Sequence, residues 1–319
     1  MAQNWVSQLS NDRYLQGPET QKAVPVIREV VENERAPALA ASDIASIHES
    51  RIRNGDTSPP LELWRVFCSA IDRFGGELET LDRLIELLRC LSELDVLDAN
   101  GLAVHSTMNG DTFWRQLPGF SIAFRDAFTG EFIHQIMQTY IVGPNDLYLG
   151  VPYVDEIEND GKFEEETRRF YNANIFQARW IINVGQAGPR REWGSAVNFA
   201  LWHLSDALEY GIARSPMGLR RTELYIPQAA QWIQIAGTVI YKLCRDREKN
   251  TGEAVIDIGS TDKAVDGFLF RGEEGFSIER WAFWKERFSQ IAGLNLKPHV
   301  SQLANAAAQR MVEIEISCS

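Results

Sequence analysis

Apolar residues recur at three- and four-residue steps along most of the chain, which is the spacing of one face of an α-helix. Ser58-Pro59-Pro60 supplies a cap and first-turn prolines, and Gly75-Gly76 supplies a stop. Between these signals lies an apolar stripe formed by Leu61, Trp64, Phe67, Cys68, Ile71 and Phe74. Residues 77–95 follow with leucines on two faces, which is typical of a helix packed between others.

Three longer patterns predict the central helices, over residues 162–184, 191–210 and 226–246. The third pattern has Pro227 at its start, a favoured position for proline in a first helical turn. Its small residues Ala229, Ala230, Ala236 and Gly237 would let another helix approach closely. A last helix is predicted after Pro298, with Val300, Ala304, Ala307, Met311 and Ile314 as its buried stripe.

The remaining segments give weaker patterns. Helices are expected near 111–116, 119–128 and 130–141, and residues 254–258 have the composition of a short strand. The acidic segment 155–161 does not meet the EF-hand alternation with glycine at the sixth position and a closing glutamate, so it is interpreted as a solvated loop. The chain is therefore predicted to be all-α, with an N-terminal arm over 1–20. Residues 21–319 would form a single large domain, an orthogonal or irregular bundle of about nine to eleven helices.

The run from Glu279 to Phe288 is rich in aromatic and arginine residues, and Ser277 is a plausible N-cap before it. Arg280 lies four residues before Trp284, and Arg287 lies four after Phe283, so each arginine could stack on that ring. Two interpretations stay open: a structural helix with stacked arginines, or an anion or ligand site that uses Arg280 or Arg287.

Charge and composition narrow the classes of partner. The net charge is -12 and the pI is near 5.0, with no basic patch, which argues against nucleic acid and against anionic membranes. No secretory signal and no membrane-spanning stretch is evident. The cysteines are far apart, and Cys68, Cys90 and Cys244 fall in apolar helical patterns as core residues. We therefore expect a cytoplasmic protein; the sequence leaves the oligomeric state open.

Three patches resemble a fungal all-helical family known only as a domain of unknown function and found near secondary-metabolite genes. They are Arg169–Arg179, Ala229–Gly237, and the residues from Gly267-Phe268-Leu269-Phe270 to Phe288. The resemblance extends over roughly 60–315 and is weakest over 95–160. It implies a helical fold and small-molecule metabolism, and it carries over no catalytic residue.

Most helical metabolite chemistries lack their motifs in this sequence. There is no aspartate-rich magnesium helix, no Glu-x-x-His pair, no His-Glu-x-x-His, no glycine-rich phosphate loop and no Gly-x-Ser-x-Gly. No metal and no other cofactor is therefore expected. The kind of catalysis that remains would rely on the shape of the site, on hydrogen bonds and on general acid or base groups.

His203 is the first candidate for such chemistry, because Asp206 one turn later could orient its imidazole for proton transfer. Asn174, Arg179 and Tyr171 are further catalytic candidates, and Tyr225 could also donate to a substrate carbonyl. The alternative for each is an ordinary packed residue or a hydrogen bond between helices. The candidate substrate-binding walls are Trp180, Trp193, Phe199, Trp202 and Trp232.

Two functions are compatible with these features. The first is a cofactor-independent enzyme of fungal secondary metabolism that holds a hydrophobic terpenoid- or polyketide-like substrate for cyclisation, of the pericyclic [4+2] type, or for isomerisation. The second is a non-catalytic helical scaffold or small-molecule-binding protein.

Overall fold

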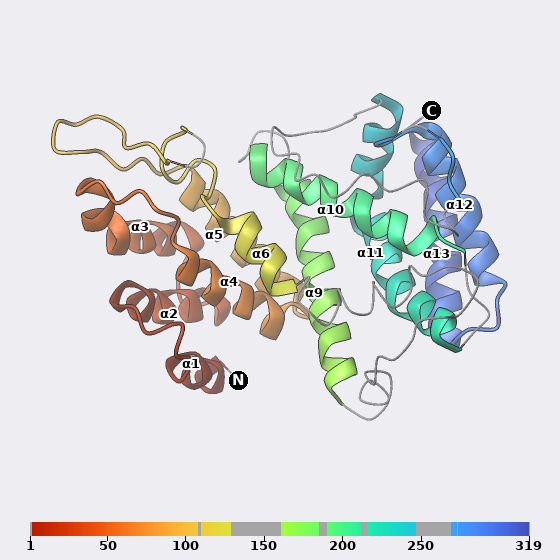
Figure 1. Cartoon of the computed structure of the whole chain (residues 1–319), viewed down its shortest axis with the longest axis horizontal. Helices are drawn as coiled ribbons and strands as arrows, with labels where there is room; N and C mark the ends of the chain where they lie inside the picture. Colours follow the sequence, from red (N-terminus) through yellow and green to blue (C-terminus); the bar gives the residue numbers. More distant parts are fainter. Residues whose placement is uncertain are drawn as a thin grey trace, which may run out of the picture. The chain divides into compact units, whose positions relative to one another are not determined.

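The chain is all-α, as the sequence predicts. The computed structural model describes residues 2–107, 110–128, 161–184, 190–211, 216–246, 269–272 and 274–318. These residues contain eleven helices and no strand (Figure 1). Their only β-type pairings are the isolated bridges Leu97–Ala103 and His105–Thr112.

The chain groups into two compact units, whereas the sequence analysis expected one domain. Unit 1 comprises Met1–Phe128 and Asn183–Trp193, and unit 2 comprises Thr129–Ile182 and Gly194–Ser319. The helices of unit 1 are α1 (Ala2–Ser10), α2 (Pro18–Val31), α3 (Pro37–Arg53), α4 (Leu61–Phe74), α5 (Leu78–Ser92) and α6 (Phe120–Phe128). Those of unit 2 are α9 (Gly161–Asn183), α10 (Arg190–Leu208), α11 (Pro216–Asp246), α12 (Ile278–Ala292) and α13 (Pro298–Ser317), with the first residues of α10 grouping with unit 1.

Unit 1 is built around the aromatic face of α4. Trp64 is fully buried, its ring meets Trp114 and Phe120 edge to face, and its indole Nε1 donates to the carbonyl of Pro118 at 2.8 Å. Such pairs add about 0.5–1.5 kcal/mol beyond the area they bury. The stripe predicted for residues 61–74 therefore forms this core, except that Leu61 is exposed.

The N-terminal residues are packed and do not form an arm. Trp5 in α1 is buried, meets Phe74 edge to face, and donates from Nε1 to the hydroxyl of Ser69 at 2.9 Å. The sequence analysis predicted an arm over 1–20; within it, residues 2–10 form the short helix α1, which buries Trp5 and Leu9. Residues 18–53, for which the pattern gave no helix boundaries, form α2 and α3.

Residues 111–116 were also predicted as helix, and they form turns. The segment is short, and Gly110, Leu117 and Gly119 all have positive φ, which a right-handed helix does not permit. Its apolar residues Phe113 and Trp114 are nevertheless fully buried. These two buried side chains therefore belong to residues in turns and not to a helix. The helix predicted over 119–128 is confirmed as α6.

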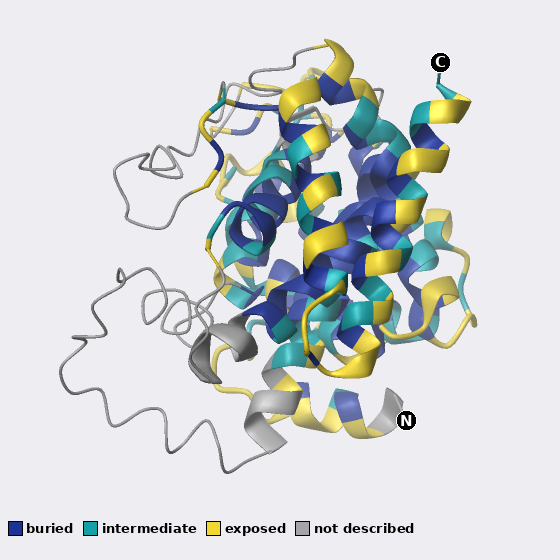
Figure 2. Cartoon of the chain, turned by 90° about the vertical axis from the view of Figure 1, so that its right-hand side faces the viewer, coloured by how far each residue is buried: buried dark blue, intermediate teal, exposed yellow. Residues whose placement is uncertain are grey.

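In unit 2, α11 packs closely on α13. A Cβ at Gly237 would lie 2.7 Å from Ile314 Cδ1, so a larger residue at Gly237 has no room unless Ile314 moves. The stripe predicted for α13 is buried throughout, and buried and exposed residues alternate around the described helices (Figure 2). The close approach inferred from the small residues of α11 is therefore confirmed at Gly237.

Helix α11 begins ten residues before the predicted start near Ile226, at Pro216. Pro227 lies inside the helix, where it forfeits one backbone hydrogen bond. Leu224, Tyr225 and Ile226 just before it are buried, so packing of this apolar turn compensates for the interruption. The helix expected over 130–141, the strand over 254–258 and the acidic loop over 155–160 lie outside the described residues.

Cys68, Cys90 and Cys244 are buried free thiols, as predicted. Burial raises the pKa of Cys244 to about 12. Within the described part of the chain, no helix has the length and apolar character needed to cross a bilayer.

Candidate functional site

Unit 2 contains a buried charged junction centred on Glu209, directly after α10. Its carboxylate accepts from Arg280 through Nε at 2.7 Å and Nη2 at 3.1 Å, a two-point ion pair. Trp284 Nε1 donates to the same carboxylate at 2.6 Å, and the Ser205 hydroxyl donates at 2.9 Å. Glu209 is therefore fully satisfied while fully buried, which is the condition under which an ion pair is tolerated in a protein interior.

Arg280 also holds the chain that leads into α12. Its guanidinium lies 4.6 Å from the ring centre of Phe270, and its Nη1 donates to the carbonyl of Gly275 at 2.5 Å. The Glu209 carbonyl accepts from the amide of Leu269 at 2.7 Å. Arg280 was expected to stack on Trp284; instead it stacks on Phe270, and Trp284 is a second donor to the carboxylate.

Arg287 binds the end of α10 as well. Its Nε donates to the Leu208 carbonyl at 3.0 Å and its Nη2 to the Tyr210 carbonyl at 3.2 Å. Burial lowers the pKa of Arg287. Both arginines therefore bind protein groups, and the structural interpretation of the aromatic–arginine run fits better than a ligand site at Arg280 or Arg287. Ser277 caps α12 as predicted, because its hydroxyl accepts from the Arg280 amide at 3.1 Å.

A second buried group of polar side chains lies among aromatic rings of α9, α10 and α11, and we call it the aromatic–polar cluster. It comprises Phe170, Asn174, Phe199, Trp202, His203, Tyr225, Gln228 and Trp232. The His203 ring lies 4.8 Å from Phe170, 5.5 Å from Phe199 and 5.2 Å from Trp202, measured between ring centres. Phe170 also meets Tyr225 at 5.8 Å, so one ring of α9 contacts both α10 and α11.

His203 is electrically neutral in this setting. It is 4% exposed, and burial lowers its pKa to about 3. Its Nδ1 has no hydrogen-bond partner among the described residues. A group this weakly basic does not exchange protons readily at neutral pH, so the anticipated proton-transfer role is disfavoured and a hydrogen-bonding role is left. Asp206, its expected orienting partner, is buried one turn later on α10.

Asn174 joins α9 to α11. Its Oδ1 accepts from Trp232 Nε1 at 2.7 Å, and its Nδ2 donates to the Phe170 carbonyl at 2.7 Å. Both ends of the carboxamide are thus engaged by protein. This is the helix-to-helix hydrogen bond that was the alternative to a catalytic Asn174, and it removes Trp232 Nε1 as a free donor.

Gln228 differs from Asn174 in this respect. It is 1% exposed, and neither its Nε2 nor its Oε1 has a hydrogen-bond partner among the described residues. Tyr225 lies three residues before it on α11 and Trp232 four after, so the three share one helix face. Along α11, Gln228 therefore lies between Tyr225, which meets Phe170, and Trp232, which donates to Asn174.

The other predicted site residues lie at several places. Trp180 is buried on α9 and stacks on Phe176, and Arg179 beside it is half-buried. Tyr171 is half-buried, pairs with Gln231 of α11, and has its pKa raised by burial. Trp193 groups with unit 1, and its side chain lies outside the described residues. Of the predicted set, the structure brings Phe199 and Trp202 into contact with His203 on α10. It also joins Asn174 of α9 to Trp232 of α11.

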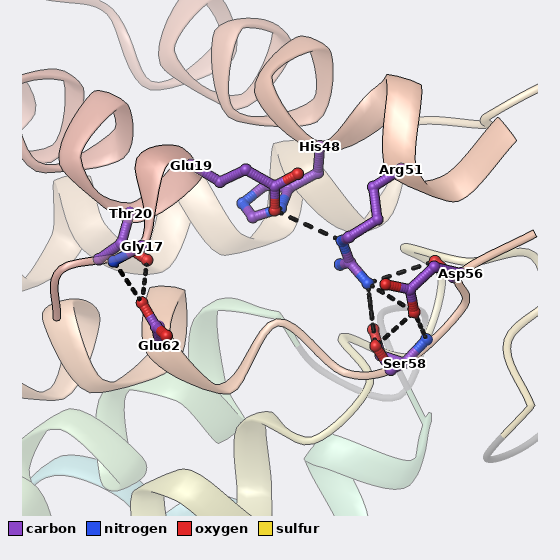
Figure 3. Close-up of polar contacts among 8 residues, drawn as sticks. All are labelled: Gly17, Glu19, Thr20, His48, Arg51, Asp56, Ser58 and Glu62. Carbon is purple, nitrogen blue, oxygen red and sulfur yellow. Dashed lines mark hydrogen bonds and ion pairs between the residues drawn. The ribbon is translucent and has the colours of Figure 1, made fainter. Parts of the chain in front are cut away.

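Unit 1 has a polar cluster of its own between α2 and α3 (Figure 3). Glu19 Oε2 lies 2.8 Å from His48 Nδ1 and 3.4 Å from Arg51 Nε. His48 is 3% exposed, and burial lowers its pKa against the opposing effect of Glu19. Arg51 also binds Asp56 and Ser58 in the following loop. Because every charged member has an opposite charge nearby, this cluster fixes the α2–α3 packing.

Comparison with known families bears on the chain as a whole. Residues 64–288 match the family model described as a protein of unknown function, DUF3632. The chain belongs to the DUF3632 family. The DUF3632 match contains all three patches on which the resemblance rested, and it ends at Phe288, the last residue of the aromatic–arginine run. No curated protein and no solved structure shows significant similarity to the chain.

Two buried residues of the DUF3632 region were missed by the sequence analysis, Glu209 and Gln228. Each is a polar residue where a buried stripe predicts an apolar one: Glu209 after Leu204 and Leu208, and Gln228 within the turn of Tyr225, Ile226 and Ala229. A polar side chain at a core-facing position is the signal that identifies both. The signal does not show that Glu209 accepts four hydrogen bonds, whereas Gln228 has no partner within the described part of the chain.

Proposed function

We propose that unit 2 of this DUF3632 protein binds a hydrophobic small molecule at the aromatic–polar cluster. The observation that carries the proposal is that Gln228 and His203 Nδ1, in a group of mostly buried aromatic rings, have no hydrogen-bond partner among the described residues. Buried polar groups are rarely left without partners, so such a pair indicates bound water or a ligand. Aromatic walls with a few polar groups are the usual composition of small-molecule sites.

We infer further that binding serves catalysis without a cofactor, as cyclisation or isomerisation of the bound molecule. A neutral His203 and the Gln228 carboxamide would act as hydrogen-bonding groups that fix the substrate and polarise a carbonyl, not as proton carriers. Holding reacting atoms in a near-attack arrangement is the larger contribution expected for a pericyclic reaction such as a [4+2] cyclisation.

The substrate class and setting in this proposal come from the family resemblance. A terpenoid- or polyketide-like molecule of fungal secondary metabolism, handled in the cytoplasm, matches an aromatic, uncharged site. The second candidate function, a non-catalytic helical scaffold or binding protein, is supported by the Glu209–Arg280 junction, which serves packing alone.

Binding is tested first, on the full chain, with the neutral fluorophore 1-aminoanthracene. We expect saturable binding with one site per chain, weakened several-fold by His203→Leu and unaffected by Arg310→Gln at an exposed position of α13. Circular dichroism verifies that the variants stay helical. Absence of saturable binding by the wild-type chain would contradict the proposal and favour the scaffold.

Catalysis is tested with a metabolite extract of the source organism. Isomerisation and intramolecular cycloaddition conserve mass, so the enzyme should convert one chromatographic feature into another of identical mass. We expect the conversion with the wild-type chain and a reduced rate with His203→Leu. If no equal-mass pair changes on addition of the wild-type chain, the catalytic part of the proposal fails while the binding part can still hold.

A further inference from the structure

The carboxamide of Gln228 presents a donor and an acceptor side by side, both buried and both without a partner among the described residues. Neither end could be assigned to water contact at the surface, because both atoms are inaccessible. A carboxamide in this state is matched by a group that offers an acceptor to Nε2 and a donor to Oε1 together.

The comparison with Asn174 shows that this state does not follow from the burial of a carboxamide alone. Asn174 lies on α9, and its Nδ2 and Oδ1 are both bound, to Phe170 and Trp232. Arg280, the buried cation of unit 2, is bound by Glu209. Among these three buried polar side chains, Gln228 alone has its hydrogen-bonding edge unused within the described residues.

The surroundings of Gln228 favour an uncharged partner with a flat apolar body. Tyr225 and Trp232 lie before and after Gln228 on α11. Phe170 of α9 meets both Tyr225 and His203, and His203 is neutral. These neighbouring groups carry no charge, so an ionised ligand group beside them would lose its hydration without compensation from them. A planar ring system could pack against the aromatic rings.

We propose that Gln228 recognises the cis-amide edge of a lactam, or the equivalent edge of a primary amide or un-ionised carboxylic acid, on an aromatic or polyene ligand. The amide N–H of the ligand donates to Gln228 Oε1, and its carbonyl accepts from Gln228 Nε2. This inference rests on the proposed binding function and gives the chemical class of the ligand.

The test compares two probes that differ in one donor, 1-isoquinolone and N-methyl-1-isoquinolone, by calorimetric titration of the full chain. Methylation removes the N–H and keeps the carbonyl and the rings. We expect the wild-type chain to bind 1-isoquinolone at least about tenfold more tightly, because a site built to pair a polar group rejects an analogue without it. Gln228→Leu should abolish this preference and leave the N-methyl probe bound about as before.

Gln234→Leu is the matched control, since Gln234 is exposed on the same helix and should keep the wild-type preference. If the Gln228→Leu variant loses its helical circular dichroism, the Gln228→Met variant is used in its place, because methionine has a side chain of similar length. Equal affinities of the wild-type chain for both probes would overturn the inference and leave the proposed binding function intact. Failure of both probes to bind would contradict the proposed function as well, with ordered water then satisfying Gln228.

Discussion

Glu209 and Arg280 form a two-point ion pair in which both side chains are buried, at 0% and 3% exposure. The residues are 71 positions apart in the sequence. With Ser205 and Trp284 as further donors, each carboxylate oxygen accepts two hydrogen bonds. The pair therefore joins the end of α10 to the start of α12. It explains why Arg280 and Trp284 of the Glu279–Phe288 run are buried: both donate to Glu209.

Arg280→Met is expected to lower the free energy of unfolding by about 3–5 kcal/mol, because it leaves Glu209 buried without its cation. Chemical denaturation monitored by circular dichroism gives the value. Arg310→Gln, which breaks an exposed pair with Glu313, serves as the control and should stay within about 1 kcal/mol of wild type. A loss under 1 kcal/mol for Arg280→Met would show that the junction contributes little.

Trp232→Phe is expected to cost about 1–3 kcal/mol, since it retains most of the ring and leaves Asn174 Oδ1 buried without its donor. Trp202→Phe is the comparison, because Trp202 is half-buried, stacks on His203, and has no side-chain hydrogen bond to the described residues that the change would remove. Unfolding measured side by side should rank Trp232→Phe as the more damaging change, and the reverse order would refute this account of Asn174.

Acid should destabilise unit 2 through His203. The pKa is about 3 in the folded state and about 6.5 in an unfolded chain, so the unfolded state alone takes up the proton between these values. The contribution of the neutral imidazole to the free energy of unfolding is therefore fully present above pH 6.5. It is lost as the pH drops towards 3, and the loss is on the order of 3 kcal/mol at pH 4.

His203→Leu should flatten this pH dependence when denaturation is measured from pH 7 to pH 4. His299→Gln, at an exposed position of α13, should leave it unchanged. A His203→Leu profile parallel to that of the wild type would mean that the imidazole is not desolvated.

Gly237→Ala and Ile314→Val should couple, because the second change removes the Cδ1 atom that a Cβ at Gly237 would approach at 2.7 Å. In an unobstructed helix, alanine is favoured over glycine by about 1 kcal/mol. We expect Gly237→Ala to stabilise the Ile314→Val background by about this amount and to have a smaller or opposite effect on wild type. Strict additivity in a double-mutant cycle would contradict the close packing of α11 on α13.

The helices were predictable where the spacing of apolar residues agrees with the residues that begin and end a helix. Helix α12 begins after the Ser277 cap, and α4 ends before Gly75-Gly76, both as expected. The prediction failed where tertiary packing overrides local signals. Pro227 indicates a helix start and lies inside α11, and Trp5 alone gives no sign that α1 is anchored by Ser69 and Phe74.

For the residues of the candidate site, the sequence predicted which helix faces they share but not which contacts they make across helices. The pattern placed His203 on a flank of its helix next to Phe199, which the structure confirms. It could not show that the imidazole is desolvated by Phe170 from α9, nor that Asn174 is committed to Trp232 from α11. Those properties depend on contacts between helices, which a periodicity within one helix does not encode.

The buried cysteines make the wild-type chain its own reporter of local opening. An alkylating reagent reacts with a thiolate, so Cys244, buried and with its pKa at about 12, should be modified only when unit 2 opens. Cys68, in the core of unit 1, reports on the other unit by the same logic. Timed alkylation followed by peptide mass spectrometry would therefore show whether unit 1 and unit 2 open together or independently, and it requires no substitution.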